Sequence, residues 1–109
     1  MHTRLLSEAD YQATLASPMR DIRNSDGPFV DIAPYLKAIA PQELNGHVML
    51  SEIPERVYLT PDRRYEHYLL PTKAPNVYLV IIADNMWRGF HGHRLLDLND
   101  LYGLEEKQK

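Results

Sequence analysis

The stretch Asn76–Asp84, with the sequence NVYLVIIAD, decides the fold of this chain. Seven apolar or aromatic residues run without a break from Val77 to Ala83, and β-branched residues and tyrosine are the types that fit a pleated surface. Pro75 precedes the run, and Asp84-Asn85 follows it. A run this short, with such ends, predicts a strand that is buried on both faces in the middle of a sheet.

Other segments of strand length lie on both sides of this run. Proline, Asp-Asn or glycine punctuation separates them, and they are His47–Ile53, Arg56–Thr60, Arg64–Leu70 and Phe90–Leu98. Their short connections predict that sequential strands pair antiparallel. We therefore expect a meander in which segments 64–70 and 90–98 flank the central strand.

The part of the chain before residue 46 has helical signals instead. Ser7 is followed three residues later by Asp10, a capping-box pattern that predicts a helix start. Apolar residues at helical spacing predict a second helix over Ile32–Ala40, with Asp31 at its start. Met19 and Ile22 are candidates for the buried side of one more short turn.

Helices followed by strands are typical of the α+β class. We expect a single domain, 1–109, with a mainly helical part (1–45), a β-meander (46–98) and a short helical turn with a charged tail (99–109), for which Asn99 is the candidate cap. The helices should pack on one face of a four- to five-stranded, mainly antiparallel, curved sheet. The other face is then closed by curling or by a second copy of the chain, and we expect curling with some homodimer contact.

Composition narrows the function classes. The formal net charge is −3, which disfavours non-specific nucleic-acid binding, and the chain has no cysteine, which excludes disulfides and thiolate chemistry. The first residues lack the apolar core of a signal peptide, and no apolar stretch approaches the ~20 residues that span a bilayer. We expect a small soluble cytoplasmic protein with no membrane partner and no cofactor.

The most specific chemical signal is His91-Gly92-His93. On a regular strand, residues two apart point to the same face, so the two imidazoles could share a metal ion. Asp97 has the same parity, and His67 is a possible fourth ligand. Histidine is nevertheless more often a half-buried structural residue than a ligand, and the metal site remains a secondary hypothesis.

Tyr65-Glu66-His67-Tyr68 places a histidine beside a carboxylate, the minimal acid–base pair. On a regular strand Glu66 and His67 point to opposite faces, so a sheet surface with amphipathic tyrosines is the more economical interpretation. No nucleophile elbow and no glycine-rich phosphate loop occurs in the sequence.

Two basic clusters could meet phosphates. One consists of Arg56, Arg63 and Arg64, and the other of Arg20 and Arg23. Acidic residues surround the first cluster, so a solvated turn is the simpler interpretation, and we do not expect nucleic-acid binding.

Met86, Trp87 and Arg88 fall in a predicted hairpin loop. Large apolar side chains at a loop tip are unusual unless something covers them, and tryptophan and arginine are favoured at binding hot spots. The alternative, a loop that folds back so that Trp87 caps the core, is equally compatible with the sequence.

Two hypotheses from different classes remain. The leading one is a non-enzymatic interaction protein, such as a regulator, inhibitor or accessory subunit, that binds a protein partner or a second copy of itself through Met86, Trp87 and Arg88. The alternative is a small enzyme or a ligand or metal sensor, with a tyrosine-lined pocket that contains His91, His93 and Asp97.

Overall fold

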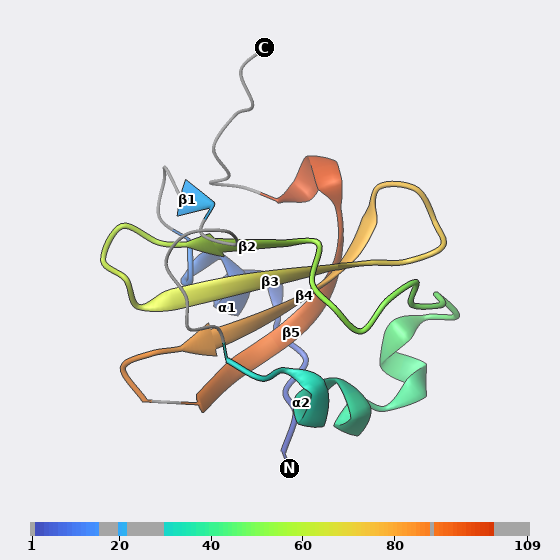
Figure 1. Cartoon of the computed structure of the whole chain (residues 1–109), viewed down its shortest axis with the longest axis horizontal. Helices are drawn as coiled ribbons and strands as arrows, with labels where there is room; N and C mark the ends of the chain where they lie inside the picture. The colour runs from blue at the N-terminus through green and yellow to red at the C-terminus, as the bar shows by residue number, and fades with distance from the viewer. Residues whose placement is uncertain (1, 16–19, 22–29, 88, 102–109) are drawn as a thin grey trace.

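An open antiparallel sheet forms the centre of the molecule. The computed structural model describes residues 2–15, 20–21, 30–87 and 89–101, with the backbone alone at 20–21. Each strand pairs with the next in chain order (Figure 1), and the strands are β1 (Arg20–Asp21), β2 (Arg56–Leu59), β3 (Tyr65–Pro71), β4 (Val77–Asp84) and β5 (Gly89–Asp97). The predicted antiparallel meander of segments 56–60, 64–70, 76–84 and 90–98 is confirmed.

Strand β4 is the central strand of this meander, as its unbroken apolar run predicts. It is hydrogen-bonded to β3 on one side and to β5 on the other, and Ile81 lies between Tyr68 and His93. Residues 79–84 of β4 are all buried. The alternating side chains of β4 therefore enter two separate hydrophobic clusters, one on each face of the sheet.

The helices are few and short. They are α1 (Glu8–Gln12), α2 (Ala33–Ala38) and the 3₁₀ helices η1 (Pro41–Leu44) and η2 (Leu98–Asp100). The Ser7 cap is confirmed, because its side chain accepts a hydrogen bond of 3.0 Å from the backbone N–H of Asp10. Among the described residues, no helix is long and apolar enough to cross a membrane. Short helices against an antiparallel sheet place the molecule in the predicted α+β class.

The two α-helices lie on opposite faces of the sheet, which corrects the expectation that both cover one face. Figure 1 shows α2 in front of the sheet and α1 behind it. Tyr35 of α2 packs with Ile81 in one cluster, whereas Tyr11 of α1 packs with Val80 and Ile82 in the other. Both dry faces are thus covered within one chain, so the need to cover an open face no longer argues for a homodimer.

Segment 47–53 is not a strand, contrary to its prediction. It makes one isolated antiparallel bridge, between Met49 and Thr72. On one side the ladder cannot extend, because a pair between Leu50 and Pro71 would need an N–H that Pro71 lacks. Ser51 also accepts a hydrogen bond of 2.9 Å from the N–H of Ile53, a local turn that competes with strand pairing.

Two local predictions nearer the ends were also wrong. Arg20–Asp21 form strand β1, paired with β2, instead of part of a helical turn; Met19 and Ile22 lie outside the described residues. The final turn is capped by Asp97, not by Asn99, because the Asp97 carboxylate accepts a hydrogen bond of 2.9 Å from the Asn99 N–H.

The N-terminal segment adds to the sheet along β5. The Leu6 N–H donates to the His93 carbonyl and the His93 N–H donates to the Arg4 carbonyl, each at 2.9 Å, around a parallel bridge at Leu5. Gly92 permits this approach. A Cβ atom at Gly92 would lie 2.6 Å from Leu6 Cγ and 2.8 Å from the Arg4 carbonyl oxygen.

Gly92→Ala should therefore destabilise the protein by about 1–3 kcal/mol, the usual cost of overpacking a closed contact. Urea unfolding measures the loss, and hydrogen exchange at the Leu6 and His93 amides should accelerate. Gly89→Ala on the same strand is the matched control, because its Cβ would meet only the Trp87 carbonyl oxygen, at 3.9 Å. Equal stabilities of the two variants would contradict the docking of the N-terminal segment.

Candidate binding pocket

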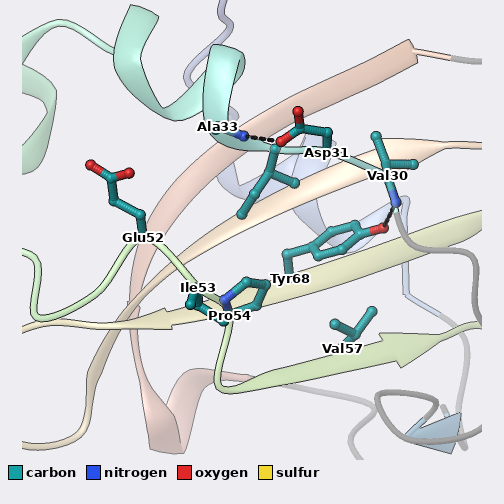
Figure 2. Close-up of a pocket in the computed structure, with 9 residues that line it drawn as sticks. Val30, Asp31, Ala33, Glu52, Ile53, Pro54, Val57 and Tyr68 are labelled. Atoms are coloured by element: carbon teal, nitrogen blue, oxygen red, sulfur yellow. Dashed lines mark hydrogen bonds between the residues drawn. The ribbon is translucent and has the colours of Figure 1, made fainter.

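A hollow of about 400 Å³ lies on the α2 side of the sheet. One wall is the segment that leads into α2, the opposite wall is the loop that precedes β2, and β2 and β3 supply the floor (Figure 2). Most of the lining side chains are apolar; the residues are Val30, Asp31, Ile32, Ala33, Glu52, Ile53, Pro54, Val57 and Tyr68. A volume of this size and an apolar lining are typical of sites that accept a small ligand or a side chain.

The floor of the pocket is fixed by a buried hydrogen-bond network. The Tyr68 hydroxyl donates to Glu66 Oε1 at 2.6 Å and accepts a hydrogen bond of 2.8 Å from the Val30 N–H. Burial, together with the hydrogen bond to Glu66, raises the pKa of Tyr68. Tyr68 therefore remains a neutral phenol that holds the first wall against the sheet, and its ring forms the floor.

The rim of the pocket is acidic. Asp31 and Glu52 are the charged lining residues, both are exposed, and Figure 2 shows their side chains projecting away from the apolar walls. Asp31 also accepts a hydrogen bond of 3.1 Å from the Ala33 N–H at the start of α2. Within the described part of the chain, neither carboxylate forms an ion pair.

Two further hollows lie at the β4–β5 hairpin, and the first of them shares a lining residue with this pocket. Val30 also lines a hollow of about 350 Å³ together with Gly89 and Phe90. Gly89 and Phe90 in turn line a third hollow of about 360 Å³, which Trp87 borders. Val30 is thus shared by the first two hollows, and Gly89 and Phe90 are shared by the second and the third.

The predicted interaction residues of the hairpin are exposed as far as they are described. Trp87 is 73% exposed and Met86 is 64% exposed, whereas Arg88 lies outside the described residues. The alternative in which Trp87 caps the core is therefore wrong. Two hydrogen bonds hold the turn that presents both side chains. The Trp87 N–H donates to the Asp84 carbonyl, and the Met86 N–H donates to the Asp84 carboxylate.

A β-bulge separates the two histidines that sequence parity places together. Against β4, Gly92 pairs with Ile82 but Phe90 pairs with Ala83, so His91 is the extra residue of the bulge. An extra residue shifts the alternation of side chains by one position.

The rings of His91 and His93 consequently face opposite sides of the sheet. The His91 ring lies 5.5 Å from the Tyr65 ring on the α1 side, and the His93 ring lies 5.6 Å from the Tyr35 ring on the α2 side. Asp97 caps η2. The hypothesis that His91 and His93 share a metal ion is therefore wrong, because it required both rings on the same face. Over the described ranges no three histidine or carboxylate side chains gather as metal ligands.

His93 belongs instead to a buried hydrogen-bond chain. Its Nε2 lies 2.7 Å from Glu43 Oε1 and its Nδ1 lies 2.8 Å from the Tyr35 hydroxyl, which accepts a bond of 3.1 Å from the Arg4 N–H. Burial lowers the pKa of His93 although Glu43 opposes this, so the ring is neutral at pH 7. A neutral ring that donates from Nε2 and accepts at Nδ1 satisfies every group in the chain.

This Glu43–His93–Tyr35 chain has the components of a proton relay, but it joins elements of the fold. It links η1, β5 and α2, and through Arg4 the N-terminal segment. The side chains of Tyr35 and His93 are almost completely buried. A substrate could not reach the phenol or the imidazole without opening the core, so the arrangement holds these elements in register.

His67 is buried on the other face, between β3 and α1. Its Nε2 lies 3.0 Å from Thr14 Oγ1, and that hydroxyl donates to the Tyr11 carbonyl at 2.7 Å. Burial lowers the pKa of His67 to about 4. Glu66 faces the pocket side through Tyr68, so the expectation that Glu66 and His67 point to opposite faces is confirmed.

Two members of the first basic cluster, Arg56 and Arg64, lie beside carboxylates. Arg64 donates two hydrogen bonds of 3.1 Å to the two Asp84 oxygens, and Arg56 lies 4.0 Å from Glu55. Burial raises the pKa of Asp84, but the bonds from Arg64 and from the Met86 N–H outweigh it and the net shift is downward. The side chain of Arg20 and the whole of Arg23 lie outside the description.

The pocket was not predicted from the sequence. Its two walls are about 20 residues apart in the chain, and neither has a motif that indicates a ligand. The available signal was Ile53, an apolar residue directly before Pro54. The structure leaves Ile53 66% exposed on the loop wall.

Comparison with known proteins assigns the chain to no family. No protein-family model matches the chain, and no curated protein and no solved structure matches it.

Proposed function

We propose that this chain is a small non-enzymatic interaction protein, and that the apolar pocket between residues 30–33 and 52–54 is its binding site. The observation that carries the proposal is the preformed pocket itself, with apolar walls and a floor whose polar groups are already hydrogen-bonded. A site of this kind gains binding energy by burying apolar surface.

The bonding of the histidines favours binding over catalysis. His93 and His67 make hydrogen bonds inside the core, and neither lines the pocket. General acid–base catalysis requires the group to be within hydrogen-bond reach of a bound substrate. The pocket side chains are instead suited to hold an apolar group.

The hairpin supplies the second part of the proposed surface. Trp87 lines the hollow of about 360 Å³ at the hairpin, Met86 precedes it in the same turn, and both side chains are exposed. A protein partner that fills the pocket could contact Trp87 as well, and tryptophan is among the residues most enriched at binding hot spots. A homodimer through Met86, Trp87 and Arg88 is the symmetric version of this contact. Cytoplasmic location and the absence of nucleic-acid and membrane partners belong to the same proposal.

A neutral apolar probe tests the pocket directly. We expect 3-phenylpropan-1-ol to bind with a dissociation constant in the millimolar range, at about 0.3 kcal/mol per non-hydrogen atom. In two-dimensional ¹⁵N–¹H NMR, the shifted amides should be those of Ile32, Ala33, Ile53 and Val57. Ala33→Phe should abolish these shifts, because the new ring occupies the pocket.

The matched control is Ala38→Phe, the same substitution at an exposed position of α2 that does not line the pocket. Ala38→Phe should bind the probe as the unmodified protein does. Saturable shifts that persist in Ala33→Phe, or no shifts at all in the unmodified protein, would overturn the proposed site.

A further inference from the structure

The charges at the rim of the pocket indicate which chemical group lies beside the apolar group that fills it. Asp31 and Glu52 are the charged residues of the pocket lining, and they carry the same sign. The hydrogen bond from Ala33 occupies one oxygen of Asp31 and leaves the carboxylate at the surface. The uncompensated charge beside the apolar walls is therefore negative.

A negative rim around an apolar hollow selects among possible occupants. A carboxylate beside the bound group would be repelled, whereas an ammonium or guanidinium group would be attracted over a few ångströms. The net charge of −3 acts in the same direction during approach of the partner. A lone apolar molecule would fill the space between the walls and make no ionic contact with the rim.

We propose that the partner is a protein segment that inserts one apolar side chain into the pocket and sets a neighbouring lysine or arginine against Asp31 and Glu52. This inference rests on the proposed function and adds the chemical class of the partner. The long apolar stem of lysine or arginine lets its charge reach the rim while the anchor remains buried. Ile53, which is exposed on the loop wall, would pack against that stem.

A displayed library of random twelve-residue peptides is the probe. The whole protein is immobilised, and peptides that also bind Ala33→Phe are removed by counter-selection. We expect the retained peptides to carry an aliphatic or aromatic residue with lysine or arginine within three positions, and to be poor in aspartate and glutamate.

A second experiment removes the two rim charges with substitutions that conserve the shape of the side chains. Asp31→Asn with Glu52→Gln should weaken the retained peptides about two- to thirtyfold, since each of the two exposed charge pairs is worth about 0.2–1 kcal/mol. Asparagine keeps an acceptor for the Ala33 N–H, so the start of α2 is preserved. Glu8→Gln with Asp100→Asn removes two charges from residues outside the pocket lining and should leave the affinities unchanged.

Each outcome separates the two proposals. The basic partner would be overturned if the pocket-dependent peptides lacked basic residues, or if they bound the Asp31→Asn, Glu52→Gln variant with unchanged affinity. Binding of the neutral alcohol would still support the pocket in that case. A library that yields no peptide sensitive to Ala33→Phe would also overturn it. Failure of the alcohol to bind would remove the proposed function itself.

Discussion

Ile81→Asp should unfold the protein or lower its free energy of unfolding by at least about 4 kcal/mol. Ile81 is 0% exposed and lies in the centre of the central strand, between Tyr68 and His93. An aspartate there would bury a charge without a partner, one of the costliest single substitutions. Urea unfolding followed by circular dichroism measures the loss.

Ile53→Asp is the matched control, because Ile53 is 66% exposed on the loop before β2. The same change of side chain there should alter stability by no more than about 0.5 kcal/mol. A cooperative transition for Ile81→Asp at the midpoint of the unmodified protein would show that β4 is not the buried centre of the sheet.

Acidification should destabilise the protein through His67. Burial lowers the pKa of His67 from 6.5 to about 4 in the folded state. Between these two pH values the unfolded chain binds more protons, so stability rises with pH across this window. Lowering the pH from 6.5 to 4 should therefore cost about 3 kcal/mol from this residue, and the downward pKa shifts of His91 and His93 act in the same direction.

The test is the free energy of unfolding in urea as a function of pH, for the unmodified protein and for His67→Gln. Glutamine can still donate to Thr14 but does not titrate, so the variant should lose the part of the slope between pH 4 and 6.5 that His67 contributes, about 3 kcal/mol over the window. His47→Gln, the same substitution at a half-buried histidine just after η1, is the matched control. A slope that His67→Gln leaves intact would contradict burial of a neutral His67.

The sequence was sufficient for the strands that are marked by an apolar run and by proline, glycine or Asp-Asn at their ends. The apolar run 77–83 and its punctuation located β4, and short connections fixed the antiparallel order of β2 to β5. The Ser7 cap was also predictable, because the residues that make it are neighbours in the chain.

Features that depend on distant contacts were not predictable from one sequence. The bulge that turns His91 away from His93 is a property of the pairing with β4, and parity alone could not reveal it. Nothing local indicates that α1 and α2 occupy opposite faces, and the pocket exists only because segments 30–33 and 52–54 meet over β2 and β3. The sequence was equally compatible with an exposed Trp87 and with a Trp87 that caps the core, and the structure shows the exposed position.

The most direct test of the binding account is an isotope-filtered nuclear Overhauser experiment on the ¹³C,¹⁵N-labelled protein with unlabelled 3-phenylpropan-1-ol. We predict intermolecular contacts from the phenyl protons of the probe to the methyl groups of Ile32, Ile53 and Val57. Contacts confined to Met86 and Trp87, or to residues on the α1 face such as Leu6, would contradict it.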